Sequence, residues 1–105
     1  MKKVKYKQPL PTMYRANGIV ELYNINASYQ LLDYYNYYNI GILGFEGFIK
    51  FENKYIPDIN WIADFSQLYI SEPENFVEKS IQVSRDILEK APKNILFEFV
   101  PLKSD

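Results

Sequence analysis

Residues 71–91, SEPENFVEKSIQVSRDILEKA, carry the strongest periodic pattern in the chain. At about 100° per residue, the apolar and small side chains fall on one helical face and the charged side chains on the other. Ser71 and Glu74 have the spacing of a capping box, so we expect a helix that begins at Ser71. Pro92 cannot continue a helical ladder and should end it. Such a helix needs an apolar surface to lie on, and we expect Val77, Ile81, Ile87 and Leu88 to be buried against a sheet.

The composition predicts one globular domain over residues 1–105. Apolar residues make up 48% of the chain and charged residues 24%, which is ordinary for a folded protein. No apolar run approaches the ~20 residues that a membrane span requires, so we expect no membrane partner. The basic N-terminus is followed by no hydrophobic segment, which gives no indication of export. The absence of cysteine excludes disulfides and thiolate metal sites, and it fits a cytoplasmic location.

The chain also contains no histidine, and this limits the chemistry available to it. Histidine is the most frequent general base, and the usual serine and cysteine triads depend on it. An enzyme would have to use aspartate or glutamate together with tyrosine or lysine. We therefore predict a binding protein with no catalytic residues, no cofactor and no metal. A metal site at Asp58 and Asp64 is an open alternative, although these residues lack a recognisable ligand spacing.

The charges divide the chain into a basic arm and an acidic body. Residues 1–17 carry a charge of +5 and no acid, whereas the remainder carries −6, which gives the total of −1. Val4, Tyr6 and Gln8 alternate with lysines as in an edge strand, which Pro9 and Pro11 should end. A basic arm can bind an acidic partner, but a terminus of this kind is more often a solvated tail.

The first half of the chain predicts a strand, a helix and a second strand. Residues 19–25 form an apolar strand. Asn26 is a candidate N-cap for a helix over residues 27–38, with Tyr29 and Tyr37 pointing outward. Residues 41–52 alternate as a long strand, and their glycines predict a bulge or a close approach of another backbone.

The second half continues with a return strand, the long helix and a last strand. Asn53 and Lys54 predict a tight turn, and the short return strand should stop at Pro57. Residues 58–70 are mixed, with one short strand near their end. Residues 94–100 form a final strand that Pro101 should end.

This element order predicts an α+β fold. Strand, helix, strand, strand, helix, strand matches the ferredoxin-like topology, a single antiparallel or mixed sheet with both helices on one face.

The candidate binding site is an acidic stretch from Asp58 to Glu78 that contains no lysine or arginine. Such a surface suits a basic partner, and its aromatic residues could anchor the contact. The alternative is structural, because Glu72 and Glu74 near a helix start stabilise the helix dipole and one of the aspartates is expected to make a turn hydrogen bond. The predicted contact residues are Asp58, Trp61, Asp64, Tyr69, Glu72, Glu74 and Glu78.

A second pattern suggests an RNA-binding module as the alternative function. Residues 44–51, GFEGFIKF, approximate the RNA-recognition strand whose aromatic side chains stack on bases. Glu46 is an insertion in that pattern, Leu43 replaces its leading basic residue, and the body is acidic. Binding of nucleic acid is therefore the less favoured prediction.

Three short segments resemble small immunity proteins of bacterial toxin–immunity pairs, including contact-dependent growth inhibition systems. They are Gly44-Phe45-Glu46-Gly47-Phe48, Pro57-Asp58 and Trp61-Ile62-Ala63-Asp64-Phe65-Ser66. The resemblance implies a cytoplasmic, non-catalytic protein that binds the C-terminal toxin domain of its own system, often a nuclease, and blocks it. It assigns no binding residue by position, and it leaves the oligomeric state and the activity of the toxin open.

Overall fold

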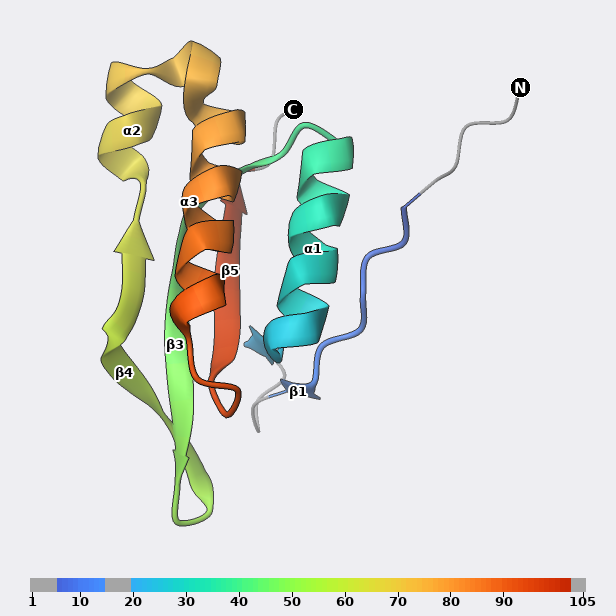
Figure 1. Ribbon diagram of the computed structural model, residues 1–105, viewed down its shortest axis with the longest axis vertical. Coiled ribbons are helices and arrows are strands. Elements are labelled where there is room, and N and C mark those ends of the chain that lie inside the picture. Colours follow the sequence, from blue (N-terminus) through green and yellow to red (C-terminus); the bar gives the residue numbers. More distant parts are fainter. Residues whose placement is uncertain (1–5, 15–19, 103–105) are drawn as a thin grey trace.

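A computed structural model of the chain describes residues 6–14 and 20–102. These residues form an α+β fold, which confirms the predicted class (Figure 1). The order of strand, helix, two strands, helix and strand is also as predicted, with a short strand and a short helix in addition. The elements are β1 (Met13–Tyr14), β2 (Glu21–Leu22), α1 (Ile25–Tyr37), β3 (Gly41–Phe51), β4 (Lys54–Asp64), α2 (Ser66–Ser71), the 3-10 turn η1 (Pro73–Asn75), α3 (Phe76–Lys90) and β5 (Leu96–Leu102).

The strands form two antiparallel sheets rather than the single sheet that we expected. One sheet has the order β4-β3-β5, and the other pairs β1 with β2. The two are linked where Tyr23 and Phe97 exchange backbone hydrogen bonds of 2.8 and 2.7 Å. The ferredoxin-like arrangement is not confirmed, because β3, which follows the first helix, lies between β4 and β5 instead of at the sheet edge.

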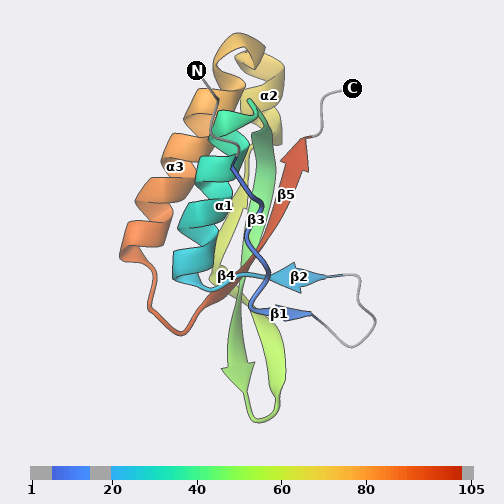
Figure 2. The same ribbon diagram turned by 90° about the vertical axis from the view of Figure 1, so that its right-hand side faces the viewer.

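Helices α1 and α3 cover one face of the larger sheet (Figures 1 and 2). The core lies between these helices and the sheet, where Phe45 contacts Phe97 and Phe99 at ring centroid distances of 5.5 Å. Ile81 and Leu88 of α3 are buried as predicted, whereas Val77 and Ile87 are partly buried at the margin of this core.

The β1–β2 hairpin packs on the other side of the sheet (Figure 2). Leu22 of the hairpin is buried against Phe48 of β3 and Leu96 of β5. Leu96 and Phe97 alternate along β5, so they face opposite sides of the sheet. Among the described residues of the predicted strand over residues 19–25, only Glu21–Leu22 form a regular strand, and the chain then leaves the hairpin to begin α1 at Ile25.

Helix α3 begins later than the capping box predicted. Ser71 is the last residue of α2, and its hydroxyl donates to the Gln67 carbonyl at 2.9 Å, so it does not cap α3. A 3-10 turn opened by Pro73 leads into α3 at Phe76, and no side chain caps this helix. The predicted end is confirmed, because Ala91 is the C-cap and Pro92 follows it.

Helix α1 begins earlier than predicted. Its N-cap is Asn24, whose side-chain oxygen accepts a hydrogen bond from the Ala27 amide at 2.8 Å, so the choice of Asn26 was wrong. Tyr29 is partly buried against the core and does not point outward. Tyr37 is 39% exposed, as the periodicity predicted.

Strand β3 contains the irregularity that its glycines predicted. Its register against β4 shifts between Glu46 and Gly47, where a Cβ on Gly47 would lie 2.6 Å from the Trp61 Cβ. A Cβ on Gly44 would lie 2.5 Å from the Ala63 carbonyl oxygen, so the neighbouring backbone approaches closely there too.

Two prolines lie inside strands that we expected them to end. Pro57 pairs with Phe48 in the middle of β4, and Pro101 pairs with Ile42 near the end of β5. Both strands flank β3 in the sheet order, and an edge position tolerates proline because one side of the strand needs no backbone donor. As a result, β4 continues past Pro57 to Asp64. The turn before β4 lies at residues 52–53, and a helix, α2, replaces the short strand predicted near residue 70.

Candidate functional site

The predicted contact residues lie on four consecutive elements at the β4 side of the molecule. Strand β4 passes directly into α2, which leads through η1 to the start of α3 (Figure 1). Asp58, Trp61 and Asp64 belong to β4, and Tyr69 belongs to α2. The other three are Glu72, which follows α2, Glu74 in η1 and Glu78 in the first turn of α3.

Two of the aspartates have local structural roles. The Asp58 carboxylate accepts a hydrogen bond from the Asn60 amide at 3.0 Å, where the register of β4 shifts. The Asp64 carboxylate accepts one from the Ser66 amide at 2.9 Å, and this bond lowers the pKa of Asp64. Asp64 therefore satisfies an amide at the start of α2, in agreement with the structural alternative for this residue.

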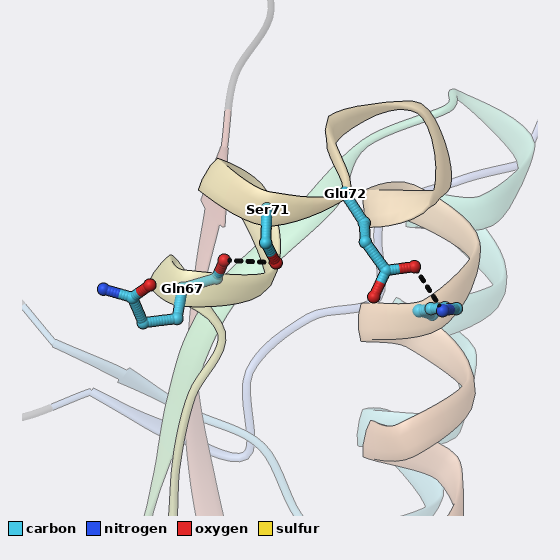
Figure 3. Close-up of polar contacts among 4 residues, drawn as sticks. Gln67, Ser71 and Glu72 are labelled. Atoms are coloured by element: carbon cyan, nitrogen blue, oxygen red, sulfur yellow. Dashed lines mark hydrogen bonds and ion pairs between the residues drawn. The ribbon is translucent and has the colours of Figure 1, made fainter.

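Glu72 is paired with a lysine from outside the acidic stretch. The Lys79 ammonium donates to the Glu72 carboxylate at 2.5 Å, and this hydrogen bond and charge lower the pKa of Glu72 (Figure 3). Ser71, the last residue of α2, precedes Glu72, and its hydrogen bond to the Gln67 carbonyl lies within α2 (Figure 3). Glu72 thus contributes less negative charge to the surface than the sequence suggested, because Lys79 is one helical turn into α3 and folds back onto it.

The two aromatic residues of the prediction differ in accessibility. Trp61 is partly buried against the core and cannot offer its whole ring to a partner. Tyr69 is 43% exposed and rests edge-on against Phe76 at a centroid distance of 5.0 Å. Tyr69 is therefore the better anchor of the two.

Exposed isoleucines were missing from the prediction. Ile59 is 82% exposed, Ile62 is 49% exposed and Ile70 is 68% exposed, on the same two elements as the aspartates and Tyr69. No local pattern marks them as exposed, because an apolar residue in a mixed segment is usually assigned to the core. Only the edge position of β4 and the exposed location of α2 leave them in solvent.

We name this combination the β4–α2 surface. Its two elements carry three exposed isoleucines, a tyrosine and two carboxylates, and no basic side chain belongs to β4 between Lys54 and Asp64 or to α2. The acidic residues Glu74 and Glu78 follow it along the chain and are exposed. Its members are Asp58, Ile59, Ile62, Asp64, Tyr69 and Ile70.

The aromatic residues of the RNA-recognition-like pattern are mostly inaccessible. Phe45 is 3% exposed in the main core and Phe48 is 2% exposed beneath the β1–β2 hairpin. Only Phe51, at the end of β3, is largely exposed at 59%. Stacking on bases requires accessible rings, so this strand offers no platform of the expected kind.

The described part of the basic arm is packed against the domain. The rings of Tyr6 and Tyr37 are in contact, tilted by 46° at a centroid distance of 4.8 Å, and the Gln8 amide donates to the Tyr23 hydroxyl at 3.3 Å. Lys2, Lys3, Lys5 and Arg15, which carry most of the charge of the arm, lie outside the described residues.

Residues 6–14 and 20–102 contain neither a cluster of metal ligands nor a helix that could span a membrane. These residues contain no group of three or more metal-ligating side chains that could hold an ion. No helix among them is both long and apolar enough to cross a membrane. Comparison with protein-family models, curated proteins and solved structures finds no match to the chain.

Proposed function

We propose that this chain is a non-catalytic immunity protein that binds and neutralises the toxin domain of its own bacterial toxin–immunity system. The contact is made through the β4–α2 surface. The observation that carries the proposal is the exposure of Ile59 and Ile70, at 82% and 68%, on the two consecutive elements that also carry Asp58, Asp64 and Tyr69.

This surface combines the two parts of a protein–protein interface. Apolar and aromatic residues at the centre of an interface supply most of the binding free energy, and the polar groups around them set specificity. The isoleucines and Tyr69 match the first role, and the carboxylates of Asp58 and Asp64, together with Glu74 and Glu78 that follow the surface along the chain, match the second.

The charge of the surface favours a basic partner, and a nuclease is such a partner. A nuclease binds a polyanion, so its active cleft requires lysine and arginine. Carboxylates that face this cleft accelerate association and cover the residues that would bind the substrate.

The proposal requires the gene immediately upstream to encode a protein with a toxic C-terminal domain, and it is tested by protection of cells that express that domain. Ile59→Ser combined with Ile70→Ser should abolish protection and leave the fold unchanged, because both side chains are already in solvent. Leu10→Ser is the matched control, since Leu10 is 84% exposed but belongs to the arm. Full protection by the folded double variant would exclude the β4–α2 surface as the contact site.

The role of charge is tested separately. Asp58→Asn, Glu74→Gln and Glu78→Gln together should slow association with the toxin domain several-fold at low salt, and the difference should shrink at high salt. Asp58→Asn keeps a side-chain oxygen that can accept from the Asn60 amide, whereas Asp64 and Glu72 are left unchanged because they support α2 and α3. An association rate equal to that of the unchanged protein at low salt would contradict an electrostatic role.

A further inference from the structure

A second feature lies at the opposite edge of the sheet and does not depend on the proposed function. A cavity of about 310 Å³ is lined by the arm, β2, the last turns of α1 and β5. Within the described residues, the outer edge of β5 pairs only at Phe97, with Tyr23, and Glu98, Phe99 and Pro101 of this strand line the cavity. The volume is near the lower limit for small-molecule sites, which suits a ligand of a few heavy atoms.

The inner wall of the cavity is aromatic. Tyr23, Tyr35 and Phe99 line it and are 3%, 6% and 8% exposed, and the partly buried Tyr34 completes this wall. Burial raises the pKa of Tyr23 and of Tyr35, so both phenols are neutral near pH 7. Aromatic faces attract cations through their ring quadrupole, and more strongly where water is excluded.

The outer wall carries acidic side chains. Glu21 is exposed and Glu98 is partly buried, and both line the cavity. The Tyr23 hydroxyl donates to the Glu21 carboxylate at 3.2 Å and accepts from the Gln8 amide at 3.3 Å, which holds the three side chains together at this wall. None of the described residues that line the cavity is a lysine or an arginine.

We propose that this cavity binds a single organic cation, a primary alkylammonium or a guanidinium group. The two glutamates provide hydrogen-bond acceptors and opposite charge, and the aromatic wall provides the apolar and quadrupolar contact. A group with N–H donors fits better than a quaternary ammonium, because the carboxylate oxygens and phenol oxygens can accept from it. Such a group could come from a free small amine or from a lysine or arginine side chain of a polypeptide.

The test is to titrate the full chain with n-butylammonium and to monitor the amide chemical shifts by NMR. We expect saturable shifts at residues around the cavity with a dissociation constant of about 1 mM, as befits five heavy atoms. The neutral analogue n-butanol should cause no saturable shift, and tetramethylammonium should bind more weakly. No saturation by n-butylammonium, or equal binding of n-butanol, would overturn the proposal.

Variants place the binding in this cavity. Glu21→Gln combined with Glu98→Gln should weaken n-butylammonium binding at least about tenfold, whereas Glu52→Gln in the distant β3–β4 turn should not. Tyr34→Leu provides a second variant that removes one ring and keeps the charges. Unchanged affinity in both cavity variants would refute the site.

A second arm of the experiment distinguishes the source of the cation. The peptide acetyl-Gly-Lys-Gly-amide presents the same ammonium on a polypeptide. Competition between this peptide and n-butylammonium supports a protein side chain as the natural ligand, and binding of the free amine alone supports a small molecule.

Discussion

The hydroxyl of Ser80 in α3 accepts a hydrogen bond from the backbone amide of Ile42 in β3 at 3.0 Å. This contact lies where the register of β3 against β5 shifts between Ile42 and Gly44. Both residues are fully buried, so the Ser80 hydroxyl of α3 satisfies a buried amide of β3 where the regular β3–β5 pairing is interrupted. The same hydroxyl donates to the Val77 carbonyl at 3.2 Å, which fixes its orientation.

Ser80→Ala should therefore destabilise the protein by about 1–3 kcal/mol, because it leaves the buried Ile42 amide without a partner. Urea denaturation measures the change. Ser71→Ala removes a hydroxyl that bonds only on the exposed surface of α2, and it should change the free energy of unfolding by less than about 0.5 kcal/mol. Equal effects of the two substitutions would show that the Ser80–Ile42 contact does not stabilise the fold.

Gly41→Ala should be destabilising through a steric clash with α3. A Cβ at this position would lie 2.2 Å from Cε2 of Phe76, whose ring is buried. Overpacking of this kind costs about 1–3 kcal/mol. Phe76→Leu should recover part of the loss in the double variant, and additive effects in this double-mutant cycle would contradict the clash.

Ile81→Ala tests whether α3 covers the sheet. Ile81 is 4% exposed in the core, and its truncation should lower the free energy of unfolding, measured by urea denaturation, by about 2–5 kcal/mol. Val83→Ala on the same helix is the control, because Val83 is 40% exposed. If the urea midpoint of Ile81→Ala equals that of the unchanged protein, α3 does not contribute to the core.

Lys79→Ala should raise the pKa of Glu72 toward its ordinary value of 4.5. The lowered pKa means that ionised Glu72 stabilises the folded state above about pH 4.5, and that this stability is lost as the pH falls through the folded-state pKa. Carboxyl-carbon NMR titration follows the change. The pKa of Asp64 depends on Ser66 and should remain lowered in the same variant. An unchanged titration of Glu72 would show that the ion pair does not form in solution.

The secondary structure of this chain follows in large part from its sequence. The helical period from Phe76 to Lys90 and the alternation from Gly41 to Phe51 are local patterns, and both elements form where those patterns lie. The glycines of β3 also predicted the irregularity that is observed, because a close neighbour excludes a side chain at each of them.

Helix starts were less predictable, since more than one residue can cap a helix. Asn24 and Asn26 are chemically equivalent, and the choice depends on where Tyr23 pairs with Phe97. Ser71 and Glu74 have the spacing of a capping box, but Ser71 is already the last residue of α2.

The acidic stretch could be read from the sequence, whereas its apolar members could not. Charge is a property of the residue, so Asp58 to Glu78 stood out from the sequence alone. Exposure depends on strand order: β4 forms an edge beside β3, and this position admits Pro57 and leaves Ile59 in solvent. The cavity at the other edge likewise requires β5, α1 and the arm to meet. The local sequence pattern therefore determined which segments form helices and strands. Only the tertiary structure decided which residues are exposed at the β4 edge of the sheet and which line the cavity at the β5 edge, because their packing partners come from distant parts of the chain.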